Sequence, residues 1–69
     1  MIINDRESAL LYIGSLSGES LDTVYKHLSR AIEAQLVCIG LCRDEETLRK
    51  HREAIATLNS AMTWKQVSL

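Results

Sequence analysis

Two helical seams that mirror each other about one point constrain the fold of this chain more than any other feature. Seam positions recur every three or four residues from Leu21 to Ile39, and again from Leu48 to Lys65. This spacing places side chains on one face of a helix. The first seam contains Leu21, Tyr25, Leu28, Ile32, Gln35 and Ile39, and the second contains Leu48, His51, Ile55, Leu58, Met62 and Lys65. When the chain folds back on itself, the numbers of each facing pair sum to 86 or 87. The sequence therefore predicts an antiparallel helical hairpin that turns at Arg43–Asp44.

A shorter helix is expected before the hairpin. Asn4 is the predicted N-cap, and Glu7 would complete a capping box three residues later. Gly18 is the predicted stop signal. These signals indicate a helix over residues 4–17.

The two hairpin helices carry their own start and stop signals. Ser20 is the predicted N-cap of a helix over 20–39, and Gly40 is expected to end it in the left-handed conformation. Asp44 is the predicted N-cap of a helix over 44–63.

Length and composition agree with an all-α fold. The chain has 69 residues, no proline and three glycines, so one small domain (residues 1–69) is expected and nothing interrupts long helices. The predicted architecture has three helices, a short N-terminal helix followed by the antiparallel hairpin. A domain this short buries only about 60% of the surface its unfolded form exposes, so its stability depends strongly on additional packing.

Gln35 and His51 are the only clearly polar residues at interior positions of the seams, and the predicted register places them opposite each other. They could satisfy each other and fix the register of the hairpin, as one polar layer does in coiled coils. The histidine could instead make the assembly pH-sensitive. In a third alternative, both side chains lie at the edge of the seam in water.

The second helix carries more apolar surface than one neighbouring helix can cover. Residues 36–42 are apolar on nearly every side, and such a helix must be covered on more than one face. We therefore expect contact with a partner protein, through self-association or against another helical chain; the alternative is a plain three-helix bundle. The predicted contact residues are Val24, Leu36, Val37 and Leu41, with Leu10, Ile13 and Leu16 as a second candidate face.

No pattern indicates catalysis, a cofactor or a small-molecule substrate, so we expect a protein that is not an enzyme. Cys38 and Cys42 lie four residues apart, with His51 as the nearest further ligand. A structural zinc site normally has four ligands, so no metal site is expected. The cysteines are predicted to be small buried hydrophobic residues.

A basic cluster provides the alternative function, a small DNA-binding or transcription-modulating protein. Its residues are Arg43, Arg49, Lys50 and Arg52. Glu45, Glu46 and Glu53 are interleaved with them, and acidic neighbours weaken the attraction to phosphates. The net charge of −1 provides no general attraction to nucleic acid. Binding to a protein is therefore the favoured prediction.

The expected location is the cytoplasm. Asn4, Asp5, Arg6 and Glu7 follow the first apolar residues directly, which is unlike a signal peptide. The apolar run at 36–42 is too short to span a bilayer, so no membrane association is expected.

The predicted turn and third helix, Gly40–Leu48 and Ala54–Leu58, resemble the small co-chaperones of type III secretion needle subunits. The resemblance covers about half of the chain, and small prophage accessory proteins have similar dimensions. It implies a cytoplasmic role in stabilising a partner, with apolar hairpin surface against a larger helical-repeat chaperone. The expected function is therefore that of an adaptor or co-chaperone.

Overall fold

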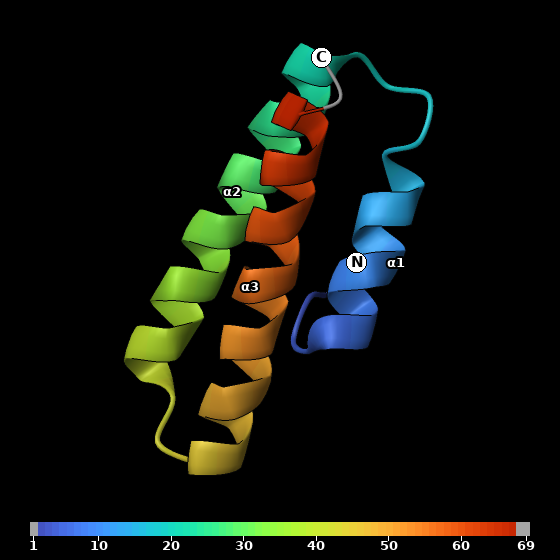
Figure 1. Cartoon of the computed structure of the whole chain (residues 1–69). Coiled ribbons are helices and arrows are strands. Elements are labelled where there is room, and N and C mark those ends of the chain that lie inside the picture. The colour runs from blue at the N-terminus through green and yellow to red at the C-terminus, as the bar shows by residue number, and fades with distance from the viewer. Residues whose placement is uncertain (1, 68–69) are drawn as a thin grey trace.

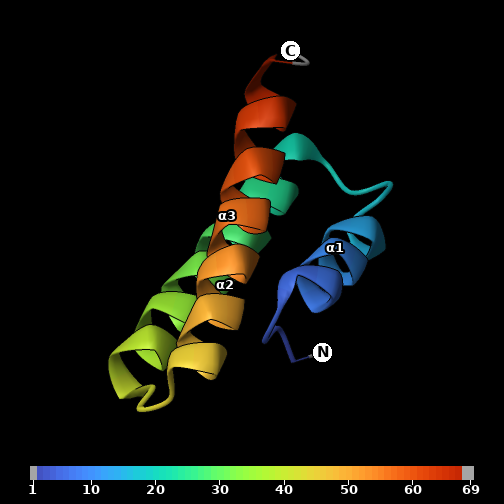
Figure 2. The ribbon, with the colours of Figure 1, turned by 60° about the horizontal axis from the view of Figure 1, so that its bottom comes forward.

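Three helices make up the described part of the chain, residues 2–67, in the computed structural model (Figure 1). They are α1 (Arg6–Ser15), α2 (Leu21–Leu41) and α3 (Glu45–Val67). The helices α2 and α3 lie side by side and antiparallel, and α1 packs along α3 (Figures 1 and 2). The predicted all-α fold, a short helix followed by a hairpin, is confirmed.

The start of α1 differs by one residue from the prediction. Asp5, and not Asn4, is the N-cap: its Oδ1 accepts a hydrogen bond from the backbone N–H of Ser8 at 2.8 Å. The hydroxyl of Ser8, and not the carboxylate of Glu7, completes the capping box by accepting from the N–H of Asp5 at 3.1 Å. A carboxylate at this position also interacts favourably with the positive end of the helix. The bond from Ser8 lowers the pKa of Asp5 below 3.8.

The predicted end of α1 at residue 17 is also wrong, because the helix stops at Ser15. Leu16 leaves the helical conformation and is buried in the core. Gly18 then adopts a positive φ of 91°, a conformation that costs glycine little. This turn directs the chain to Ser20, where α2 begins.

Ser20 is the N-cap of α2, as predicted, and its hydroxyl accepts from the N–H of Thr23 at 3.3 Å. The prediction that Gly40 ends this helix in the left-handed conformation is wrong. The helix continues to Leu41, and the next residue, Cys42, is extended with φ −70° and ψ 133°. An extended cap redirects the chain without a positive φ, so Gly40 remains within the last helical turn.

Asp44 caps α3, as predicted: its Oδ2 accepts from the N–H of Thr47 at 3.0 Å. The helix continues past the predicted end at residue 63 to Val67. The predicted seam pair of Leu21 with Lys65 falls outside the described residues, because the side chain of Lys65 is not described.

The buried apolar core lies where α1 meets the hairpin. It consists of Ala9, Leu16, Val24, Leu28, Ala54 and Leu58, and the largest fully buried side chains are Leu28 and Leu58. Leu28 and Leu58 form one of the predicted seam pairs. Ala9 and Ala54 are fully buried, and small side chains at these positions let α1 approach α3 closely. The hydroxyl of Tyr12 also joins α1 to α2 by donating to the carbonyl oxygen of His27 at 3.4 Å.

Two residues predicted to contact a partner belong to this core instead. Val24 is 3% exposed and Leu16 is 9% exposed, so neither is available on the surface. Both pack in one buried cluster with Ala9 of α1 and with Ala54 and Leu58 of α3. The N-terminal helix thus covers part of the apolar surface for which a partner was predicted.

Candidate protein interaction surface

The apolar surface that remains uncovered lies on the last turns of α2. Leu36 is 56% exposed, Val37 is 64% exposed and Leu41 is 76% exposed. Gly40 lies between them and is exposed as well. These four residues, at positions i, i+1, i+4 and i+5, share one side of the helix. We call Leu36, Val37, Gly40 and Leu41 the α2 patch.

The α2 patch lies at the closed end of the hairpin, which projects beyond α1 in both views (Figures 1 and 2). No residue from 36 to 50 is buried in the structure. The predicted seam pair at this end, Ile39 with Leu48, is only half-buried. The sequence placed Leu36, Val37 and Leu41 on a surface outside the seam, and the structure leaves all three exposed.

A polar layer separates this end from the apolar core. Gln35 is 3% exposed and His51 is 8% exposed, so the alternative that both lie at the edge in water is wrong. The side-chain N–H₂ of Gln35 donates to the carbonyl oxygen of Ile3 at 2.5 Å, which fixes the orientation of the amide. Oε1 of Gln35 then lies 2.5 Å from Nδ1 of His51, so Nδ1 carries the hydrogen and donates.

This layer joins three segments of the chain: the residues before α1, the middle of α2 and the first half of α3. The contact between Gln35 and His51 confirms the predicted register of the hairpin. The sequence did not indicate the role of Ile3, because a backbone carbonyl has no residue-specific signal. The alternative that the histidine makes an assembly pH-sensitive stays a prediction.

The second candidate face, on α1, is divided by the structure. Leu10 is 49% exposed, Ile13 is half-buried against the core and Leu16 is buried. Leu10 and Ile13 line an open groove of about 440 Å³ between α1 and α3. The other lining residues are Arg6, Thr57, Ser60 and Ala61. The three residues therefore do not form one continuous surface.

Two exposed apolar residues were not predicted as contacts. Leu11 is 67% exposed and Ile2 is 82% exposed. The run from Ala9 to Ile13 contains more consecutive apolar residues than one face of a helix can bury, and this signal could have identified Leu11.

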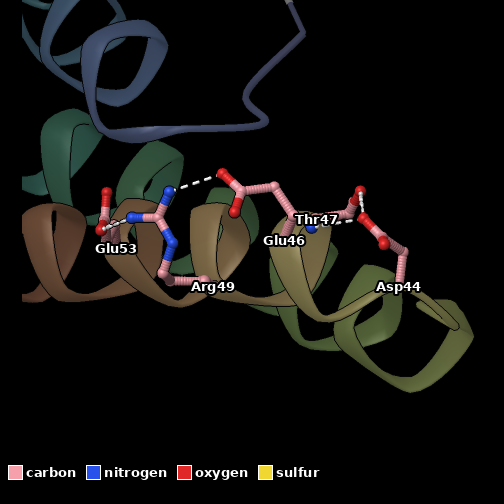
Figure 3. A network of polar contacts seen from close by, with 5 residues as sticks. All are labelled: Asp44, Glu46, Thr47, Arg49 and Glu53. Carbon is pink, nitrogen blue, oxygen red and sulfur yellow. Dashed lines mark hydrogen bonds and ion pairs between the residues drawn. The ribbon is translucent and has the colours of Figure 1, made fainter.

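The exposed face of α3 at the closed end has the opposite character (Figure 3). The guanidinium of Arg49 donates to Oε1 of Glu46 at 2.6 Å and to Oε1 of Glu53 at 2.5 Å. The hydrogen bond to Glu46, together with both negative charges, raises the pKa of Arg49. Beside them, Asp44 binds the hydroxyl and the N–H of Thr47. These exposed side chains satisfy one another's hydrogen-bonding groups and charges.

This network bears on the residues of the DNA-binding alternative. Arg43, Lys50 and Arg52 are exposed, but Arg49 already binds two carboxylates of its own helix. His51, which lies within the same run of sequence, points into the polar layer. The structure therefore does not gather the basic side chains into one free positive surface, and the alternative stays an untested prediction.

The cysteines, the potential metal ligands and the length of the helices were also considered as signs of function. Cys38 and Cys42 are free thiols and are half-buried, not fully buried as predicted, because the described residues cover the end of α2 only in part. Among the described residues, no three His, Cys, Asp or Glu side chains form a group that could hold a metal ion. Within residues 2–67, none of the helices combines the length and the apolar character that crossing a bilayer requires.

No family model, curated protein or solved structure matches this chain.

Proposed function

We propose that this protein is a small protein–protein interaction module that binds through the α2 patch. The observation that carries the proposal is the exposure of three large apolar side chains, Leu36, Val37 and Leu41, on adjacent turns of one helix. Single exposed hydrophobic residues are normal on protein surfaces, but a contiguous group commonly marks a contact site. The partner would be a helix that lays an apolar face on α2, in the adaptor or co-chaperone role that the sequence predicted.

The free energy gained by burying the α2 patch indicates what kind of partner surface it requires. Complete burial of one Leu or Val side chain contributes about 1.5–3 kcal/mol, so covering the exposed fractions of these three would contribute roughly 3–6 kcal/mol. Association itself costs roughly 4–15 kcal/mol in lost freedom of motion. The patch on its own is therefore too small for tight binding to a polar surface. A suitable partner must bring an apolar surface of its own.

Capture of partner proteins from an extract of the source cells tests the proposal. Tagged wild-type protein is compared with Val37→Asp, which places a charge in the middle of the α2 patch. Ala56→Asp is the matched control, because it adds the same charge at an exposed position of α3. We expect a protein that is retained by wild type and by Ala56→Asp and is lost with Val37→Asp. Circular dichroism should show equal helix content for all three.

Two results would contradict the proposal. The first is a set of captured proteins that is the same for Val37→Asp and wild type, which would mean that the patch is not the contact. The second is a loss of helix content in Val37→Asp but not in Ala56→Asp, which would mean that Val37 supports the fold of the monomer.

A further inference from the structure

Two free thiols lie at the end of α2, beside the α2 patch. Cys38 belongs to the last turn of the helix, and Cys42 is its C-cap. Both side chains are half-buried, so solvent reaches each of them. Residues four positions apart share one side of a helix, with about 5–6 Å between their Cβ atoms. The two cysteines therefore form a pair of neighbouring nucleophilic groups.

The backbone of the cap keeps Cys42 on the same side of the helix as Cys38. Its φ is −70° and its ψ is 133°. A φ of −70° is close to the helical value, and φ determines where the Cβ atom lies relative to the preceding turn. The extended ψ redirects only the chain that follows. The side chain of Cys42 thus starts where a continuing helix would place it.

A disulfide between these two positions requires a small movement. The Cβ atoms of a disulfide are about 3.5–4.5 Å apart, so the two must approach by roughly 1–2 Å from their helical spacing. The last turn is closed by a bond from the N–H of Cys42 to the carbonyl oxygen of Ile39 at 3.2 Å, three residues back and not four. Such bonds have poorer geometry than those of a regular α-helix. No residue from 36 to 50 is buried, so the movement displaces no core side chain.

Gly40 lies between the two cysteines and makes this turn easier to rearrange. Glycine within a helical turn is less favourable than alanine. No atom lies within 4 Å of the position that a Cβ would occupy at Gly40, so no contact inside the described chain requires a glycine there. Its wide range of backbone angles lets the turn change shape when the cysteines are joined.

We propose that Cys38 and Cys42 are an oxidation site at which a low-molecular-weight disulfide, such as glutathione disulfide, joins the two thiols. The thiolate of one cysteine attacks a sulfur of glutathione disulfide, and the first glutathione leaves as a thiolate. The thiolate of the other cysteine then attacks the protein sulfur of this mixed disulfide, and the second glutathione leaves. One disulfide is reduced and one is formed. The two glutathione thiolates take up the two protons that the cysteines lose.

The disulfide changes the α2 patch. Leu41 lies between the two cysteines, whereas Leu36 and Val37 precede both. Drawing the cap toward the helix therefore moves Leu41 relative to Leu36 and Val37, and oxidation controls whether the patch keeps its shape. This control of binding rests on the proposed function, whereas formation of the disulfide does not. In a reducing compartment the disulfide forms only transiently, as is usual for redox-sensing cysteines.

Oxidation of the purified full-length protein tests the site. Reduced protein is equilibrated with glutathione disulfide at about 0.1 mM, below the mM effective concentration of a group tethered by a short linker. The remaining thiols are then alkylated, and the masses of the products are measured. Wild type should become mainly a monomer without alkyl groups, lighter by two hydrogen atoms. Cys38→Ser and Cys42→Ser, the matched controls, should carry one glutathione or one alkyl group.

Two further readouts concern the last turn. Circular dichroism of wild type should show the loss of about one helical turn on oxidation, and that of the two serine variants should not change. Gly40→Ala should lower the equilibrium constant for the disulfide roughly two- to fivefold, because alanine stabilises the helical turn that has to be rearranged.

Each contrary result has a separate meaning. Wild type that forms only glutathione adducts, or only chains linked in pairs, overturns the oxidation site. A disulfide that forms without loss of helix overturns its effect on the last turn. Capture of a partner that depends on Val37 and is equal for the reduced and oxidised protein overturns the control of binding and leaves the proposed function standing. A disulfide that forms in a chain whose captured proteins do not depend on Val37 contradicts the proposed function alone.

Discussion

At the end of the hairpin that α1 covers, α2 and α3 share two fully buried leucines, Leu28 and Leu58. At the closed end no residue from 36 to 50 is buried, although this part of α2 is as apolar as any in the chain. The two ends differ in their number of neighbours, because two helices bury only the strip along which they touch and a third is needed to cover the flanks. The layer of Gln35 and His51 marks the boundary between them.

The difference in burial between the two ends should have its largest effect on the free energy of unfolding when an apolar side chain is shortened. Leu58→Ala should reduce the free energy of unfolding by about 2–5 kcal/mol, because it leaves a cavity in the core. Leu41→Ala should change it by no more than about 0.5 kcal/mol, because Leu41 is exposed. Urea denaturation at low protein concentration, where association does not contribute, measures both values. Similar costs for the two variants would show that the closed end is as well packed as the core.

A smaller loss of stability is expected from substitutions in the polar layer of Gln35 and His51. Gln35→Leu leaves the Nδ1–H of His51 and the carbonyl oxygen of Ile3 without their partner, which should cost about 1–3 kcal/mol. In the double variant Gln35→Leu, His51→Leu one of these unpaired groups is removed. We therefore expect the double variant to be less destabilised than the sum of the two single variants. A double-mutant cycle from urea denaturation measures this coupling, and strictly additive costs would show that the two side chains act independently.

The smallest expected effect on stability concerns Asp44, the N-cap of α3 at the closed end of the hairpin. The hydrogen bond from the N–H of Thr47 lowers the pKa of Asp44 below 3.8, so folding favours the ionised carboxylate. The stability that this cap contributes is fully present above pH 3.8 and is lost as the pH falls through the lowered pKa of the folded state. Asp44→Asn keeps a capping side chain that does not titrate.

The measurement for this cap is the midpoint of thermal unfolding between neutral and strongly acidic pH. The advantage of wild type over Asp44→Asn should shrink as the pH falls. The cap of α1 serves as an internal reference, because Asp5 has a pKa lowered in the same direction and is present in both proteins. An advantage that does not change with pH would mean that the charge of Asp44 has no role.

Much of the fold could be predicted because its determinants are local or periodic. Ser20 and Asp44 cap their helices as expected, since a cap depends on residues three positions apart. The contact of Gln35 with His51 followed from the two seams alone, since helix periodicity determines which residues face each other when the chain folds back. The candidate surface was predicted for the same reason at Leu36, Val37 and Leu41.

The errors have a common cause in contacts between distant segments. Val24 lies on the same helix as Leu36, and the sequence assigned both to one binding surface. The structure buries Val24 in the core with residues of α1 and α3 and exposes Leu36, because the end of α2 near the turn projects beyond α1. Periodicity tells which side of a helix is apolar but not which neighbour covers it.

The sequence by itself thus determined the three helices, the hairpin and its register, through spacing and caps that act over a few residues. The tertiary structure alone decided where α1 lies, that the carbonyl of Ile3 joins the polar layer, and which apolar residues remain on the surface. These features depend on how far a ten-residue helix extends along a hairpin twice its length, and no local pattern encodes that.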